Sequence, residues 1–268
     1  MQKRPVGRCA SGLLATALVL LLVPGNAEAK VRYARVTRAA KDVTLISASG
    51  VTRGTINAVV TEGTLVRTGP ESQTELQFSD QTLARLGAKT AFIFSRDRGA
   101  MDLRSGAMLV RAPASAAGTE VNADAATITV AGTTSLIEHN PGKYLKLVVL
   151  DGTVRIYLKA HVGESVLVKE GQLLMFHLSP SLTSLPNPVD VDIKRLMATS
   201  KLIRGYPPIG SETSIDGGIA NQKKEKTAGA LAETNLVIYG RGTVVSLVDP
   251  ASSPSPTPVP KRTTDHGR

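Results

Sequence analysis

The chain has a single cysteine and no tryptophan among its 268 residues, and aromatic residues make up only 3% of it. Cys9 lies within the first 29 residues, which are expected to be removed on export. The mature protein is then expected to contain no thiol, no disulfide bond and no cysteine ligand for a metal. Because few aromatic rings are available to stack on bases, a nucleic-acid partner is not expected either.

Long apolar runs are also missing, except near the N-terminus. Leu13–Val23 is shorter than the roughly 20 residues that a membrane-spanning helix needs. It follows the bases Lys3, Arg4 and Arg8, and Ala27-Glu28-Ala29 stands before Lys30. This order is typical of a cleavable signal peptide at residues 1–29, with an uncleaved membrane anchor as the alternative. We therefore expect an exported protein, periplasmic or secreted, without a transmembrane helix in the mature chain.

Acidic residues are fewer than basic ones, and the formal net charge is +10. Removal of residues 1–29 takes away three bases and one acid, so that 29 bases and 21 acids remain, a net charge of +8. A basic protein favours anionic neighbours. The expected partner is an unknown envelope protein or an anionic envelope polymer.

Catalytic and metal-binding patterns are absent as well. The four histidines share no metal-ligand spacing; they are His139, His161, His177 and His266. We interpret His139 as a turn residue and His177 as the half-buried end of a strand. No Gly-x-Ser-x-Gly motif occurs, and no helical pattern follows Gly240-Arg241-Gly242, as a phosphate loop would require. No catalytic, cofactor-binding or metal-binding residue is predicted, and the protein is not expected to be an enzyme; an unrecognised polysaccharide enzyme is a rival interpretation.

What the chain does contain, over residues 30–178, is a series of short β-branched runs separated by glycine-containing turns. Such a series is typical of an all-β sandwich or a short β-solenoid built from stacked hairpins. Two apolar runs meet at Asp151-Gly152, and this dipeptide predicts a hairpin with a type I′ turn. A polar or acidic residue followed by glycine recurs as a weak internal echo, which suggests one hairpin design used repeatedly; it occurs at Glu62-Gly63, Ser105-Gly106, Asp151-Gly152 and Glu170-Gly171.

Beyond Phe176 the pattern changes, and one amphipathic helix is predicted at residues 186–205. Asn187-Pro188 resembles an N-cap followed by proline, and Asp190 and Asp192 suit the first turn of a helix. Gly205 is expected to end this helix. Residues 206–268 are interpreted as a low-complexity, disordered tail with a possible hairpin at 236–248.

Several of these segments together resemble the FecR domain, which is named after the ferric-citrate transport regulator. The resemblance covers about Thr61–Leu158, with Gln81 where glycine is usual and Ser135 where phenylalanine is common. The segments that carry it are Gly63–Gly69, Thr74–Asp80, Leu83–Gly87, Leu103–Gly106, Val130–Thr133 and Val149–Val154.

The resemblance implies an all-β stack of hairpins and one of two roles. One is the periplasmic part of a membrane-spanning anti-sigma factor, which requires a spanning helix before the domain. The other is a free exported protein, which the predicted signal peptide favours. We therefore expect a non-enzymatic binding or scaffolding module in the cell envelope. The alternative is a periplasmic regulator acting in trans on an outer-membrane receptor or a sigma/anti-sigma system.

Overall fold

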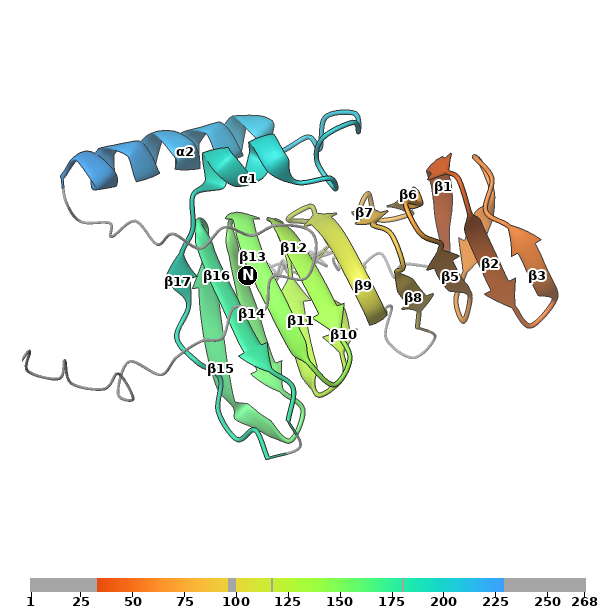
Figure 1. Cartoon of the computed structure of the whole chain (residues 1–268), viewed down its shortest axis with the longest axis horizontal. Coiled ribbons are helices and arrows are strands. Elements are labelled where there is room, and N and C mark those ends of the chain that lie inside the picture. Colours follow the sequence, from red (N-terminus) through yellow and green to blue (C-terminus); the bar gives the residue numbers. More distant parts are fainter. Residues whose placement is uncertain (1–32, 96–99, 117, 180, 229–268) are drawn as a thin grey trace, which may run out of the picture.

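A computed structural model describes residues 33–228, except 96–99, 117 and 180. The predicted signal peptide, the possible hairpin at 236–248 and His266 lie outside the described residues. The described part contains seventeen strands and two helices, α1 (Ile193–Thr199) and α2 (Glu212–Thr227). Figure 1 shows the strands following one another along the long axis of the molecule, from the orange β1–β5 to the green β12–β16.

The strands form two sheets that share one long strand, β9. Sheet A runs in the order β4 (Val59–Thr61), β1 (Tyr33–Ala40), β6 (Gln73–Phe78), β7 (Leu83–Leu86), β9 (Met101–Ala112), β12 (Thr133–Asn140), β13 (Tyr144–Asp151), β16 (Gln172–His177) and β17 (Val189–Asp190). Sheet B runs in the order β3 (Gly50–Arg53), β2 (Val43–Ser47), β5 (Leu65–Thr68), β8 (Ala91–Phe94), β9, β10 (Thr119–Ala123), β11 (Ala126–Val130), β14 (Thr153–Leu158) and β15 (His161–Lys169). All of these pairings are antiparallel except β9 with β10. The expected all-β stack of hairpins is confirmed.

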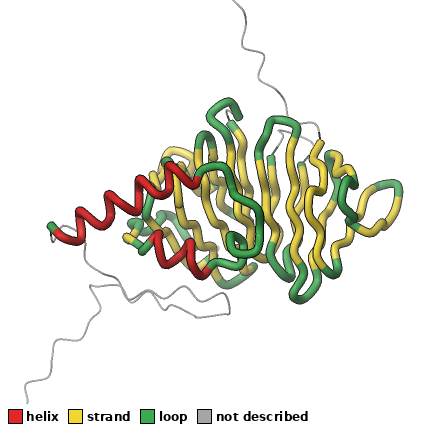
Figure 2. The backbone as a smooth tube through the Cα atoms, turned by 90° about the horizontal axis from the view of Figure 1, so that it is seen from above, coloured by secondary structure: helices red, strands yellow, loops and turns green. Residues whose placement is uncertain are grey.

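Two apolar layers hold this sandwich together. The larger core lies between the sheets and includes Val66, Phe92 and Ile156. A second cluster lies on the outer face of sheet A, where α1, α2 and the segment between them cover it. In Figure 2 both helices lie along the same side of the stack of strands. Strand β13 is therefore buried on both faces, with Leu147 in the first layer and Val148 in the second.

The chain changes sheets at left-handed corners. All four glycines of the echo have positive φ and stand where the chain passes between sheets; they are Gly63 (φ 82°), Gly106 (94°), Gly152 (83°) and Gly171 (74°). Corners of neighbouring layers are hydrogen-bonded to one another, as in the N–H of Gly171 to the carbonyl of Val149 at 2.9 Å and the N–H of Val191 to that of Gly171 at 2.8 Å. The echo thus marks inter-sheet corners, which a hairpin interpretation does not describe.

The predicted hairpin at Asp151-Gly152 is wrong. Strand β13 pairs with β12 and β16 in sheet A, whereas β14 pairs with β11 and β15 in sheet B. Of the two turn residues only Gly152 has positive φ, and a type I′ turn needs both. The two runs belong to different layers because β13 is covered on both faces, which requires a continuous apolar run, whereas β14 is half-exposed and alternates.

The predicted helix is also corrected. Val189–Asp190 is strand β17, and α1 begins at Ile193 with Asp192 as its N-cap, whose carboxylate accepts the N–H of Arg195 at 2.8 Å. The region assigned to the tail contains α2, sixteen residues long. Its amphipathic pattern is weak, with two adjacent glycines, so packing on sheet A decides its conformation rather than intrinsic propensity.

A buried arginine fastens the segment between the helices to sheet A. Arg85 of β7 points away from the inner core, yet it is 0% exposed. Its Nε donates to Glu75 Oε2 at 2.8 Å, and its two terminal nitrogens donate to the carbonyls of Leu202 (3.3 Å) and Pro207 (2.6 Å). Its guanidinium lies 4.5 Å from the ring centroid of Tyr206. Burial raises the pKa of the Tyr206 hydroxyl to about 12, so this ring stays neutral beside the cation.

We predict that Arg85→Ala lowers the free energy of unfolding by about 3–5 kcal/mol, because it leaves the Glu75 carboxylate buried without its partner. Denaturant unfolding measures the loss, and limited proteolysis should show faster cleavage between residues 201 and 226. Arg67→Ala, at the exposed position of strand β5 in sheet B, is the control and should stay within about 0.5 kcal/mol. A loss below about 1 kcal/mol for Arg85→Ala would contradict the anchoring role.

Gly106 provides a second test, because β9 passes from sheet B to sheet A there. A Cβ at this position would lie 2.4 Å from Thr90 Oγ1 and 2.5 Å from Thr90 Cα. Gly106→Ala should therefore cost about 2–5 kcal/mol, as left-handed strain and overpacking add. Gly142→Ala, also at positive φ but with open space around it, should cost only about 1–2 kcal/mol. Equal losses would show that the close approach to Thr90 has no effect.

Candidate functional site

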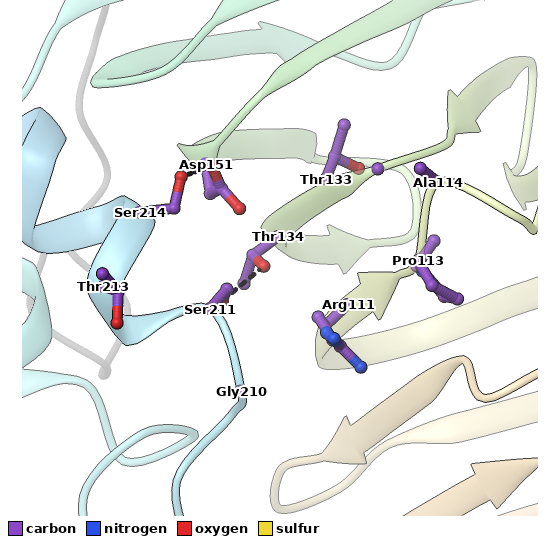
Figure 3. A pocket seen from close by; sticks show the side chains of 12 residues that line it. Arg111, Pro113, Ala114, Thr133, Thr134, Asp151, Gly210, Ser211, Thr213 and Ser214 are labelled. Atoms are coloured by element: carbon purple, nitrogen blue, oxygen red, sulfur yellow. Dashed lines mark hydrogen bonds between the residues drawn. The ribbon is translucent and has the colours of Figure 1, made fainter.

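The larger of two pockets lies where strand ends of sheet A meet the start of α2 (Figure 3). We call it the crossover pocket; its volume is about 480 Å³. Its walls come from four separate parts of the chain. They are the end of β9 (Arg111, Ala112, Pro113, Ala114), the start of β12 (Gly132, Thr133, Thr134), the corner residue Asp151, and the residues that open α2 (Gly210, Ser211, Thr213, Ser214).

Two segments of the FecR-like pattern touch each other beside this pocket. A Cβ at Gly152 would lie 2.7 Å from the carbonyl oxygen of Gly132 and 3.0 Å from Thr133 Cγ2. The corner between β11 and β12 therefore packs directly on the corner between β13 and β14. This contact gives Gly152 a structural reason, since no larger residue fits at that position.

Hydroxyl groups tie α2 to these corners. Thr134 Oγ1 and Ser211 Oγ are 2.8 Å apart, and Ser214 Oγ donates to Asp151 Oδ1 at 2.6 Å; Figure 3 shows both contacts as dashed lines. The carboxylate of Glu212 accepts the backbone N–H groups of Ile209 and Gly210. Burial acts to raise the pKa of Glu212, but these N–H donors and the charge of Arg85 outweigh it, and the pKa is lowered.

The polar groups of the crossover pocket suit docking better than catalysis. Ser214 donates to Asp151, but a serine nucleophile needs a base such as histidine or lysine at its hydroxyl. The lining residues include no histidine, lysine or cysteine. Arg111, the cation of the pocket, stays protonated and cannot act as a base. The arrangement holds the start of α2 against the corners of sheet A.

A smaller pocket of about 280 Å³ surrounds His139, together with Asp102, Asp124 and Lys159. His139 is not the turn residue that we predicted; it lies in β12 and is 4% exposed. Its Nδ1 donates to the carbonyl of Leu103 at 2.7 Å, and its buried Nε2 has no hydrogen bond, with Asp124 Oδ2 at 3.9 Å.

The other residues singled out by the sequence lie apart from both pockets. His177 ends β16 as expected but is exposed rather than half-buried, and His161 opens β15. Asp190 is in β17, and Asp192 caps α1. Within the described residues, no cluster of three or more histidine, cysteine or acidic side chains could hold a metal ion. Neither helix of the described part has the length and apolarity to cross a membrane.

Sequence reasoning missed an acidic contact under α2. Glu170, in the corner between β15 and β16, has a buried Oε1 without a hydrogen-bond partner. A Cβ at Gly218 would lie 1.5 Å from this oxygen, so Gly218 of α2 makes room for the carboxyl group. Burial, and then the charge of Asp151, raises the pKa of Glu170 above its ordinary 4.5.

This shift predicts how Glu170 affects stability. A raised pKa favours the protonated group in the folded state, so its contribution is present below pH 4.5 and is lost as the pH rises through the raised value. Glu170→Gln should therefore be more stable than the parent protein at pH 7 and similar to it at pH 4. Urea unfolding at both pH values measures this. Glu164→Gln, on the exposed part of β15, should show no such difference; the idea fails if the two variants behave alike.

Comparison with known proteins gives one family match. The family model described as FecR protein matches residues 64–155. No curated protein matches the chain.

Two crystal structures from Parabacteroides distasonis, each named as a candidate anti-sigma factor, show a distant likeness. The structure at 2.50 Å resolution has a TM-score of 0.41 and 12% identity, and the match covers 50% of this chain and 62% of that one. The structure at 1.65 Å resolution has a TM-score of 0.43 and 11% identity, with 59% and 74% covered. The chain thus spans less than two thirds of the first of these proteins.

The family match runs from β5 into β14 and so includes the shared strand β9 and the corners at Gly106, Gly132 and Gly152. These are the segments on which the resemblance in the sequence rests. Residues 64–155 of the chain thus match the FecR family, as the resemblance in the sequence predicts.

Proposed function

We propose that this protein is a non-enzymatic binding module of the cell envelope that acts in signalling by holding a partner protein. The supporting observation is the difference between its two sheet faces. Sheet A is covered by α1, α2 and the segment anchored by Arg85. The outer face of sheet B carries neither helix, and it presents Arg67 and Arg155 to solvent.

The FecR domain supports the regulatory part of this proposal. The family takes its name from a transport regulator, and its motif residues here build corners and turns rather than a reactive centre. A rigid frame with one broad face left open suits a protein that binds a partner through that face. The expected export signal at residues 1–29 favours the envelope as the place of action.

Charge is consistent with a partner that is anionic where it touches sheet B. Neither Arg67 nor Arg155 forms an ion pair within the described part of the chain, and both side chains are exposed. Exposed unpaired cations accelerate association with an anionic surface and make it sensitive to salt. An anionic envelope polymer is the second candidate partner, and its binding would show the same dependence on salt.

The test is site-specific photo-cross-linking of the full chain in its own cells. A cross-linking residue in place of Tyr157, on the open face of sheet B, should yield a defined adduct with one envelope protein. The same residue in place of Lys194, exposed on α1, is the control and should yield none. Edman sequencing of the purified protein should begin near Lys30.

Two results would overturn the proposal. Adducts formed equally from both positions, or from neither, would remove the evidence for a partner on sheet B. Shortening of purified envelope glycan by the protein, lost when one carboxylate is substituted, would make it an enzyme. Retention on that glycan without cleavage, released by salt and without any protein adduct, would favour the polymer.

A further inference from the structure

The edge of sheet B formed by β3 is unusually exposed. All four residues of this strand are exposed, and Val51 is 69% exposed, more than any other large apolar side chain in the described part. Natural sheets commonly protect edge strands with lysine, proline, a bulge or a covering loop. Strand β3, Gly-Val-Thr-Arg, has no lysine or proline, and its only pairing among the described strands is with β2.

The hydrogen-bond phase of the hairpin shows which backbone groups of β3 face outward. The N–H of Gly54 donates to the carbonyl of Val43 at 2.8 Å, so these two residues form a hydrogen-bonded pair. Such pairs alternate with non-bonded pairs along an antiparallel ladder. The pairs Thr44–Arg53 and Ile46–Val51 are therefore of the non-bonded type. The backbone N–H groups of Val51 and Arg53 point away from β2, toward the open edge.

Two rows of side chains run up to this edge on the outer face of sheet B. The first is aliphatic and follows the register from Ile93 through Leu65 and Ile46 to Val51. The second lies next to it and contains Arg67, Thr44 and Arg53. Both arginine side chains are exposed, and neither forms an ion pair in the part of the chain that the structure describes.

We propose that β3 is a docking edge for a strand of a partner protein that carries an aliphatic residue and an acidic residue two positions apart, on one face of that strand. Carbonyl groups of the partner strand would accept hydrogen bonds from the outward N–H groups of Val51 and Arg53. Its aliphatic side chain would lie beside Val51, and its carboxylate would lie beside Arg53. Backbone hydrogen bonds give affinity in this mode, and the alternate side chains give selectivity. The inference rests on the proposed binding function and gives it a surface and a partner chemistry.

An acidic aliphatic strand suits this edge better than a lipid surface or a polysaccharide. The open backbone donors stand 2 residues apart on one strand, which matches the repeat of another strand. Neither a lipid headgroup layer nor a sugar chain offers carbonyl groups at that spacing together with an aliphatic side chain between them. The chain's overall positive charge favours the acidic member of the pair.

The probe is an acetylated eight-residue peptide in which valine and aspartate take turns at every second position, with threonine between them, so that both lie on one face of the strand. Its binding to the full chain is followed by fluorescence anisotropy. Arg53→Glu should weaken binding at least tenfold, because it replaces attraction with repulsion. Val51→Pro should weaken it similarly, because it removes one outward N–H. Lys194→Glu and Val162→Pro, at exposed positions of α1 and the other edge strand β15, are the matched controls and should stay within twofold. A valine–lysine peptide should not bind.

Amide hydrogen exchange locates the contact. Bound peptide should slow exchange of the Val51 and Arg53 amides at least tenfold and leave β15 unchanged. The inference is overturned if the β3 variants bind the peptide like the parent protein, if β15 is protected instead, or if anionic vesicles or glycan compete fully with the peptide. It is also overturned if these amides already exchange slowly without peptide, because another part of this chain or a second copy then occupies the edge.

The β3 docking edge and the proposed binding function can fail independently of each other. If the cross-linked envelope partner of the parent protein is still captured by Arg53→Glu and Val51→Pro, the binding function stands and the β3 docking edge fails. If the peptide binds at β3 but no envelope partner is captured from sheet B, the edge stands and the proposed function fails. Circular dichroism of each variant confirms that it is folded, and Arg53→Glu, at a fully exposed strand end, keeps the test valid if Val51→Pro unfolds.

Discussion

The buried guanidinium of Arg85 is the constraint on which the arrangement of the C-terminal part depends. A cation enclosed on the outer face of a sheet is costly unless its donors are all engaged. Glu75 satisfies one side of it, but the carbonyls of Leu202 and Pro207 come from a segment more than a hundred residues later. The segment between α1 and α2 therefore has to lie in one position, and this position determines where α2 begins. Such an ion pair contributes less to net stability than to selecting one arrangement of the chain.

The corners impose the second constraint, which acts along the stack. Each change of sheet needs a left-handed residue, and glycine adopts that conformation at little cost. At Gly106 and Gly152 the neighbouring corner also leaves no room for a side chain. The FecR pattern thus largely marks the positions where the chain passes from one sheet to the other.

Local patterns in the sequence were sufficient to predict the class of fold. They were insufficient to predict how the strands are connected. Val154, Ile156 and Leu158 alternate with more exposed residues, as is typical of a half-exposed strand. Asp151-Gly152 nevertheless looked like a hairpin, because turn chemistry reports one glycine and not the sheet to which the next strand belongs. The unbroken run in β13 was the available clue, since only a strand covered on both faces needs it. Arg85, next to apolar residues of a short strand, had no signal of burial, because its partners are remote in sequence. Helix α2 was missed for the same reason: its conformation is decided by contacts of Ile215 and Gly218 with sheet A.

The same physics explains why one face of the molecule is available for binding. Both described helices cover sheet A, and the contacts of Arg85, Ser211 and Ser214 hold this cover in place. The outer face of sheet B has no such cover and contacts solvent, and polar residues alternate along its strands over most of its width. The exception is the row that ends at Val51, where aliphatic side chains reach the surface beside unpaired arginines. This row is the surface that we propose as the docking site for a partner strand.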